Sequence, residues 1–233
     1  MTRPQNNANR LPLIIGTLLA AGLIGAALFA GADNSKKAEA DKAAPAEFNL
    51  AGQPFTGKED APVTMVVVED FKCPACKGFE DKVFPVLNTK YMETGKVKAY
   101  TIIWPFLAEK AKLPEDDSKY AAQASLCMYD QKGNEGFGRY RSVLFRAQGE
   151  ESKVWATKDT LKELANNVEG LDSAAFAQCL DSDATAARVE ANEKQVLAAG
   201  VGGTPAIFVN GKRVDATQPA IEKALDQALA AQP

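Results

Sequence analysis

The hydrophobic positions of this chain fall into runs of clearly different length. Residues 11–32 form one uncharged apolar stretch, LPLIIGTLLAAGLIGAALFAGA. Two shorter runs rich in β-branched residues, 63–69 (VTMVVVE) and 97–104 (VKAYTIIW), have the length of buried strands. Between them, from 76 to 91, apolar residues recur at helical spacing. This pattern predicts a β–α–β unit, in which the helical crossover makes the two strands parallel.

The region from about 115 to 199 has the pattern of successive helices separated by glycines. Aspartates stand near several expected helix starts, where a side-chain oxygen can accept a free backbone N–H. They are Asp159, Asp172 and Asp183. The acidic residues 115–117 are interpreted as a solvated start of the first of these helices.

The last part of the folded region returns to strands. Residues 206–209 and 212–214 flank Asn210-Gly211, the dipeptide that best fits a two-residue hairpin turn. Residues 219–230 have the pattern of a final amphipathic helix. The predicted order of elements is therefore β–α–β, a helical block, and then β–β–α.

The long apolar stretch at 11–32 predicts the compartment of the protein. At about 1.5 Å per residue it can cross a hydrocarbon core of roughly 30 Å, and the arginines before it favour a cytoplasmic N-terminus. Two interpretations stay open: an uncleaved anchor, which the length favours, and a signal peptide cleaved after Ala32. Residues 33–47 are small and charged and predict a flexible linker. The folded domain is expected at 48–232, outside the cytoplasm.

Composition narrows the possible chemistry. The chain contains no histidine, which excludes Ser–His–Asp and Cys–His catalysis and any metal site with histidine ligands. The formal net charge is −3 and no basic block stands out, so nucleic acid is not an expected partner. The chain contains four cysteines: Cys73, Cys76, Cys127 and Cys179. We predict neither a metal nor a cofactor.

The segment Cys73-Pro74-Ala75-Cys76 follows the first long predicted strand and opens the next helix. The N–H groups and the dipole at a helix N-terminus stabilise an anion, so the thiolate of Cys73 is favoured there. With two residues between them, the sulfurs can cycle between dithiol and disulfide. Cys73 is predicted to attack and Cys76 to resolve the mixed disulfide.

The CPAC segment has two other interpretations. Half of a zinc site is one, but neither a second C-x-x-C nor a histidine is present to complete it. An inert structural disulfide is the other. The placement between a strand and a helix favours a redox-active pair.

A second marker lies about 130 residues later, where Gly202-Gly203-Thr204-Pro205 precedes the strand at 206–209. A proline is tolerated at a strand start because its missing N–H need not join the ladder, and a simple turn into a strand is the alternative. The segments VTMVVVEDFK-CPAC-KGFE and GVGGTPAIFVNG, with the helical block between them, resemble DsbA-family proteins of the thioredoxin superfamily. The resemblance covers roughly residues 48–232.

This resemblance implies an α/β fold of the thioredoxin type, with a helical subdomain inserted at about 115–199. It also implies that the bond before Pro205 is cis and that Pro205 lies against the CPAC cysteines. Thr204 would then offer backbone groups to an extended substrate chain.

Three positions near the cysteines were compared with the family pattern. Strongly oxidising members carry histidine where this chain has Ala75, and Val67 stands where thioredoxin-like relatives often bury an acid. Glu80 matches the family's acid seven residues after the first cysteine. We expect Glu80 either to assist proton transfer at Cys76 or to be a solvated residue on the helix surface.

The other two cysteines, Cys127 and Cys179, each lie on the apolar face of a predicted helix. A free buried cysteine is a common core residue. In an oxidising compartment, however, two lone cysteines in one helical block are better explained by a bond, and some DsbA-like proteins carry a second, structural disulfide. We therefore expect a Cys127–Cys179 disulfide.

The function expected from these features is that of an extracytoplasmic thiol–disulfide oxidoreductase that introduces disulfides into exported proteins. Its expected partners are reduced or unfolded exported proteins and a membrane redox partner, and a monomer is the default. A reductase or isomerase of the same fold is the first alternative. A chaperone-like binding module with a structural CPAC disulfide is the alternative from another class.

Overall fold

The computed structural model describes residues 45–232. The predicted anchor or signal segment at 1–32 and most of the linker at 33–47 lie outside the described residues. Within the described part of the chain, no helix combines the length and the apolar composition that a membrane crossing requires.

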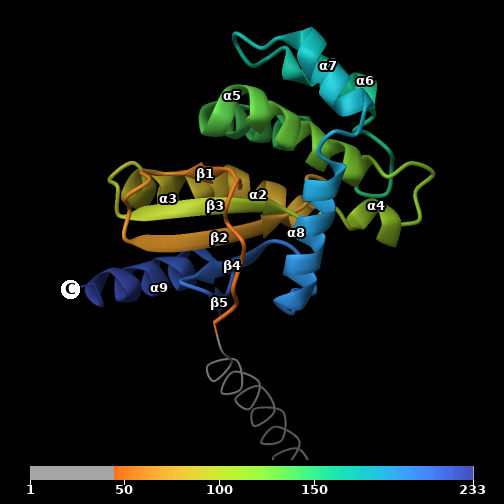
Figure 1. Ribbon diagram of the computed structural model, residues 1–233. Coiled ribbons are helices and arrows are strands. Elements are labelled where there is room, and N and C mark those ends of the chain that lie inside the picture. The colour runs from red at the N-terminus through yellow and green to blue at the C-terminus, as the bar shows by residue number, and fades with distance from the viewer. Residues whose placement is uncertain (1–44, 233) are drawn as a thin grey trace, which may run out of the picture. The chain divides into compact units, whose positions relative to one another are not determined.

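The central sheet has five strands in the order β1-β3-β2-β4-β5 (Figure 1). They are β1 (Phe55–Thr56), β2 (Val63–Glu69), β3 (Val97–Ile103), β4 (Ala206–Val209) and β5 (Lys212–Val214). As predicted, β2 and β3 are parallel, and the remaining strand pairs are antiparallel. The bounds of β2 to β5 agree with the prediction to within one residue, whereas the short edge strand β1 was not predicted.

The helix predicted directly after β2 is divided into shorter helical elements. The elements are α2 (Pro74–Lys82), α3 (Phe84–Leu87), the π-helix η1 (Asn88–Met92), α4 (Leu107–Lys110), α5 (Asp117–Ala147), α6 (Lys158–Ala165), α7 (Ser173–Asp181), α8 (Ala186–Ala198) and α9 (Gln218–Ala230). The single helix expected from 76 to 91 is divided into α2, α3 and η1. Pro85 explains the first break, because a proline lacks the N–H that would continue the helix.

The side chains of β2 alternate between two hydrophobic cores, as the period of a strand requires. Val63, Met65 and Val67 pack on the side of α2, α3, η1 and α9. Val66 and Val68 pack on the opposite side, against residues of α8 and of the segment at 46–50. Both faces are covered, which is why β2 appears in the sequence as an almost continuous apolar run.

The inserted helices build a third core of their own, which includes Tyr140, Phe145 and Phe176. The helices α5, α6 and α7 lie together on one side of the sheet layer, above it in the view of Figure 1. The core continues to the end of β2, where it includes Cys73 and Cys76. The insertion therefore forms one wall of the predicted redox site.

The expected helix starts are correct at some positions and displaced at others. Asp172 is the N-cap of α7 and accepts hydrogen bonds from two backbone N–H groups. Asp159 lies in the first turn of α6, whose N-cap is Thr157. Asp183 precedes α8 with a positive φ of 53°, and the N-cap there is Thr185. At both displaced starts, a threonine and an aspartate of similar N-cap propensity lie two residues apart. The tertiary contacts therefore decide which of the two caps the helix.

Candidate redox site

The CPAC segment lies at the junction of β2 and α2. Cys73 is the N-cap of α2 and has an extended backbone, with φ −76° and ψ 116°. Pro74 follows as the first helical residue, a position where a missing N–H is tolerated because the helix offers it no acceptor. Cys73 is 7% exposed and Cys76 is fully buried, and both are free thiols. Cys73 is thus the more exposed of the two cysteines.

The surroundings of the two thiols shift their pKa values in opposite directions. A hydrogen bond from Cys76 lowers the pKa of Cys73 to about 6, against the opposing effect of burial, and the backbone N–H groups of Cys76 and Ala75 contribute. Burial raises the pKa of Cys76, with smaller contributions from Cys73 and the charge of Glu69. At neutral pH the pair is therefore a thiolate at Cys73 and a thiol at Cys76, as nucleophilic attack by Cys73 requires.

The second marker lies directly beside Cys73, although it is 131 residues away in sequence. In its protonated form, Cys73 donates a hydrogen bond of 3.3 Å to the Thr204 carbonyl, and the Thr204–Pro205 peptide bond is cis. Antiparallel pairing of β4 with β2, with Val68 opposite Ala206, brings the two segments together. The structure thus unites Cys73, Cys76, Thr204 and Pro205 in one site.

Asp70 holds the loop between β2 and the cysteines. Its carboxylate accepts hydrogen bonds from the backbone N–H groups of Phe106 and Leu107, both 3.0 Å, and from the hydroxyl of Ser118 at 3.2 Å. It also accepts from the N–H of Lys72. Burial raises the pKa of Asp70 to about 6. One carboxylate thus connects the loop to the segment before the inserted helices and to α5.

Lys72, the residue directly before Cys73, is fully buried and forms an ion pair with Asp117 at 2.9 Å. Its ammonium also donates to the Lys153 carbonyl at 2.7 Å, while Asp117 accepts the backbone N–H groups of Trp155 and Ala156. The prediction that residues 115–117 are solvated is therefore wrong for Asp117. The buried ammonium of Lys72 supplies the compensating charge that makes this burial possible.

Gln148, at the C-terminal end of α5, makes a further connection from the insertion. Its side-chain amide donates to the carbonyls of Phe71 and Cys73, at 2.6 and 3.1 Å. Together with the contacts of Asp70 and Lys72, these bonds fix the backbone that carries the first cysteine.

Glu80 is buried, so its interpretation as a solvated surface residue is wrong. Its carboxylate accepts hydrogen bonds from Ser142 at 2.7 Å and from the guanidinium of Arg141. The same guanidinium binds Glu69, which is fully buried at the end of β2. Sequence analysis missed Glu69 and Arg141. The sequence could have indicated Glu69, because it is a charged residue at the end of an otherwise apolar strand. No local sequence pattern distinguishes Arg141 from the other charged residues of its helix.

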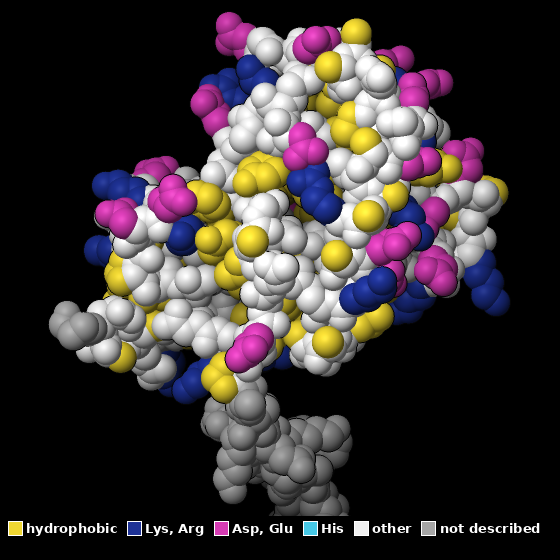
Figure 2. Space-filling model, in the orientation of Figure 1, with side chains coloured by type: hydrophobic (Ala, Val, Ile, Leu, Met, Phe, Trp, Pro, Cys, Tyr) yellow, Lys and Arg dark blue, Asp and Glu magenta, His cyan; other side chains and the backbone are white. Residues whose placement is uncertain are grey.

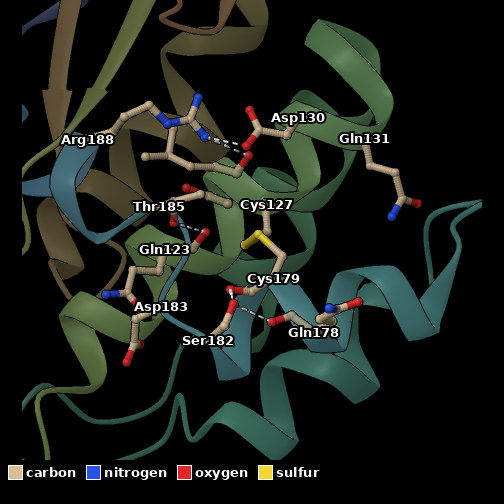
Figure 3. Close-up of a disulfide and its surroundings, with 12 residues drawn as sticks. Gln123, Cys127, Asp130, Gln131, Gln178, Cys179, Ser182, Asp183, Thr185 and Arg188 are labelled. Carbon is tan, nitrogen blue, oxygen red and sulfur yellow. Dashed lines mark hydrogen bonds and ion pairs between the residues drawn. A yellow bond between two sulfur atoms is a disulfide. The ribbon is translucent and has the colours of Figure 1, made fainter.

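The prediction of a second disulfide is confirmed. Cys127 of α5 and Cys179 of α7 are bonded, with an S–S distance of 2.01 Å and a Cα–Cα distance of 6.0 Å. Figure 3 shows this bond between the two helices. On one side of it an ion pair joins Arg188 to Asp130 at 2.6 Å. The bond fastens α7 to the part of α5 before the kink at Gly133, whereas Arg141 lies after that kink.

Among residues 45–232, no group of three or more His, Cys, Asp or Glu side chains has the arrangement of a metal site. The chemistry that this arrangement supports directly is thiol–disulfide exchange, because a stabilised thiolate and a protonated partner thiol adjoin at a helix N-terminus.

Known proteins share this sequence pattern and this fold. The sequence model of the family described as Thioredoxin matches residues 49–227. The "Probable disulfide bond formation protein D" of Bacillus cereus is 30% identical over 183 residues, which cover 78% of this chain and 81% of that protein.

Two solved structures extend the likeness to three dimensions. The oxidised BdbD of Bacillus subtilis superposes with a TM-score of 0.73 at 28% identity, over 81% of this chain and 99% of that one. The DsbA of Chlamydia trachomatis has a TM-score of 0.69 at 24% identity, over 82% and 98%, a likeness of fold alone. With its CPAC dithiol, this chain belongs to the thioredoxin family and is a DsbA-like protein-disulfide oxidoreductase.

Proposed function

We propose that this enzyme introduces disulfides into exported proteins through Cys73 and Cys76, outside the cytoplasm. The observation that carries the proposal is the position of Cys73 at the N-terminus of α2, where the pKa of its thiol is lowered to about 6. A stabilised thiolate favours the reduced enzyme, and this makes the oxidised enzyme a better disulfide donor. The Cys127–Cys179 bond and the apolar stretch at 11–32 support a location where disulfides persist.

In the proposed reaction a substrate thiolate attacks the sulfur of Cys73 in the oxidised enzyme. The Cys73–Cys76 bond breaks, a mixed disulfide forms, and the sulfur of Cys76 takes up a proton. A second substrate thiolate then attacks the substrate sulfur of the mixed disulfide and releases Cys73 as a thiolate. Two electrons pass from the substrate to the enzyme, and a membrane redox partner is proposed to remove them.

The loop around the cis bond is the proposed contact for the substrate chain. Thr204 and Pro205 are half-buried and lie beside the sulfur of Cys73, so an extended peptide can pair with the backbone there. On the face shown in Figure 2, acidic and basic side chains are interspersed and not separated by sign. A face with charges mixed in this way does not favour a polyanion such as nucleic acid.

The first test is the equilibrium reduction potential of the full-length protein. A strongly oxidising family member has a potential of about −120 mV and an attacking thiol pKa of about 3.5, whereas thioredoxin has about −270 mV and about 7. With a pKa of about 6 for Cys73, we expect a value between these two potentials. A potential at or below that of thioredoxin would reject disulfide donation and favour the reductase.

Oxidation of a reduced peptide with two cysteines provides the second test. Wild-type enzyme should form the peptide disulfide, and Cys73→Ser should not. A chaperone with a structural CPAC disulfide would instead suppress aggregation equally well in both forms, so a Cys73→Ser variant with unchanged activity would reject the enzymatic role.

A further inference from the structure

Arg141 connects the inserted helix α5 to the two elements that carry the redox pair. Its side chain is buried and makes a bidentate contact with Glu69 of β2, from Nε to Oε1 at 2.5 Å and from Nη2 to Oε2 at 2.8 Å. Its third nitrogen, Nη1, donates to Oε2 of Glu80 on α2. One guanidinium therefore joins three elements at the base of the site.

Burial raises the pKa of Glu69, and the contacts with Arg141 oppose this effect by favouring the charged carboxylate. Both oxygens of Glu69 accept from Arg141, and the two oxygens of Glu80 accept from Arg141 and Ser142. A protonated Glu69 would have to donate one of its two bonds, and a guanidinium has no acceptor to receive it. The group as a whole carries one more negative than positive charge in a buried place, which is tolerable only with the cation present.

The other ionisable groups near this cluster do not replace that cation. Lys77 of α2 directs its ammonium to the Phe145 carbonyl on α5, and Asp70, next to Glu69, is occupied by backbone N–H groups and Ser118. Cys73 and Cys76 lie at the start of α2, and the charge of Glu69 raises the pKa of Cys76.

Aromatic rings enclose the guanidinium. Its central carbon lies 4.6 Å from the ring centre of Phe84 and 5.5 Å from that of Phe145. Both arrangements are favourable cation–π contacts, and the rings occupy space that water would otherwise fill. The cation is thus held in position and shielded from solvent.

We propose that Arg141 is a positioning residue of the redox site: from the inserted helix it keeps Glu69 and Glu80 charged and in place beneath Cys73 and Cys76. This inference rests on the proposed function, since it concerns the same redox pair. Arg141 then determines how many protons the enzyme takes up when the disulfide is reduced. Above the range where Cys73 titrates, reduction of the disulfide takes two electrons and one proton and yields a Cys73 thiolate and a Cys76 thiol.

Without the guanidinium, one carboxyl becomes a second proton site. A buried glutamate with no cation nearby can titrate as high as about pH 8–9, and the Cys73 thiolate, which is present only in the reduced enzyme, raises the pKa of Glu69 further. Reduction of an Arg141→Met variant should then take up more than one proton per two electrons between about pH 7 and 8.5.

The experiment measures two pH profiles on full-length protein, the thiolate absorbance of Cys73 and the reduction potential. Wild type should show one thiolate transition and a tenfold change in the reduction equilibrium per pH unit, about 30 mV. Arg141→Met should show a broadened thiolate transition and a potential that changes by more than about 30 mV per pH unit between about pH 7 and 8.5. The matched control is Arg139→Met on the same helix, whose side chain is exposed and pairs with Glu135; it should behave as wild type.

Identical profiles for folded Arg141→Met and wild type would overturn the proposal. Loss of a buried cation can prevent folding, so Glu80→Gln provides an independent test that leaves the Glu69–Arg141 pair neutral. With one negative charge fewer, this variant should raise the thiolate fraction of Cys73, and an unchanged titration would again contradict the proposal. A wild-type protein that titrates as expected but fails to oxidise the peptide would reject only the proposed function.

Discussion

The two cysteine pairs of this chain place the same chemical group in two different environments. Cys73 and Cys76 belong to the first turn of one helix, beside a loop from the far end of the chain, and remain thiols. Cys127 and Cys179 come from two different helices, 52 residues apart, and form a disulfide. Both pairs lie in or against the core of the inserted helices, so burial alone does not explain the difference.

The environments differ in what each offers to a thiolate. Around Cys73, a neighbouring thiol and free N–H groups at a helix start stabilise the negative charge. Cys127 lies within α5 and is 3% exposed, where the backbone N–H groups are used by the helix itself. A reactive cysteine therefore needs hydrogen-bond donors that the helix does not already use. A structural cysteine needs a second cysteine at a fixed position, in a place where such donors are absent.

The largest effect should come from Cys73→Ala. Loss of the sulfur that forms the mixed disulfide should lower the rate of peptide oxidation by at least about a thousandfold, since the variant has no Cys73–Cys76 bond to transfer. The double variant Cys127→Ala/Cys179→Ala should stay within about twofold of wild type in the same assay. Equal losses in the two variants would show that the second bond also takes part in turnover.

Loss of the second disulfide should instead reduce stability. A loop of 52 residues loses much of its entropy in the unfolded chain when it is closed, so Cys127→Ala/Cys179→Ala should lower the free energy of unfolding by about 2 to 4 kcal/mol. Denaturant unfolding of the enzyme with reduced Cys73 and Cys76 measures this. The titration of the Cys73 thiolate should be unchanged, and a shifted titration would mean that α7 influences the redox site.

The pH should affect the reduced enzyme more than the oxidised one. In the reduced fold the pKa of Cys73 is about 6, below its ordinary value of 9.0, so the thiolate stabilises the fold fully above about pH 9 and this contribution disappears as pH falls towards 6. From pH 8 to 7, the folding equilibrium of the reduced form should weaken by up to about tenfold relative to the oxidised form. Parallel pH profiles of the two forms would contradict the lowered pKa.

The smallest effect concerns the ion pair beside the structural disulfide. The side chains of Arg188 and Asp130 are 38% and 48% exposed, and such surface pairs contribute little. Arg188→Met should therefore reduce the free energy of unfolding by less than about 1 kcal/mol, measured in the same denaturant experiment. A loss as large as that of the disulfide variant would show that this pair holds α8 against α5 far more strongly than other surface pairs do.

Local patterns in the sequence predicted most of the sheet and the core of the site. The β-branched runs defined β2 and β3, and Asn210-Gly211 predicted the hairpin turn, in which both residues have positive φ angles of 46° and 78°. CPAC after a strand predicted the redox pair at the start of α2. These features rest on neighbours in the chain, so short-range rules suffice for them.

Other features could not be predicted because their causes lie far away in sequence. Asp117 was expected to be solvated and is buried because Lys72 pairs with it from 45 residues away. Glu80 was left between two interpretations, and Arg141, 61 residues further on, accounts for its burial.

The sequence by itself determined the order of β2 to β5 along the chain, the position of the two reactive cysteines and the family to which the resemblance pointed. Only the tertiary structure decided which charged residues are buried together and how the insertion holds the CPAC loop. The physical reason is that a buried charge requires a partner at hydrogen-bonding distance. Whether a distant residue provides that partner depends on the packing of whole elements and leaves no trace in the local pattern.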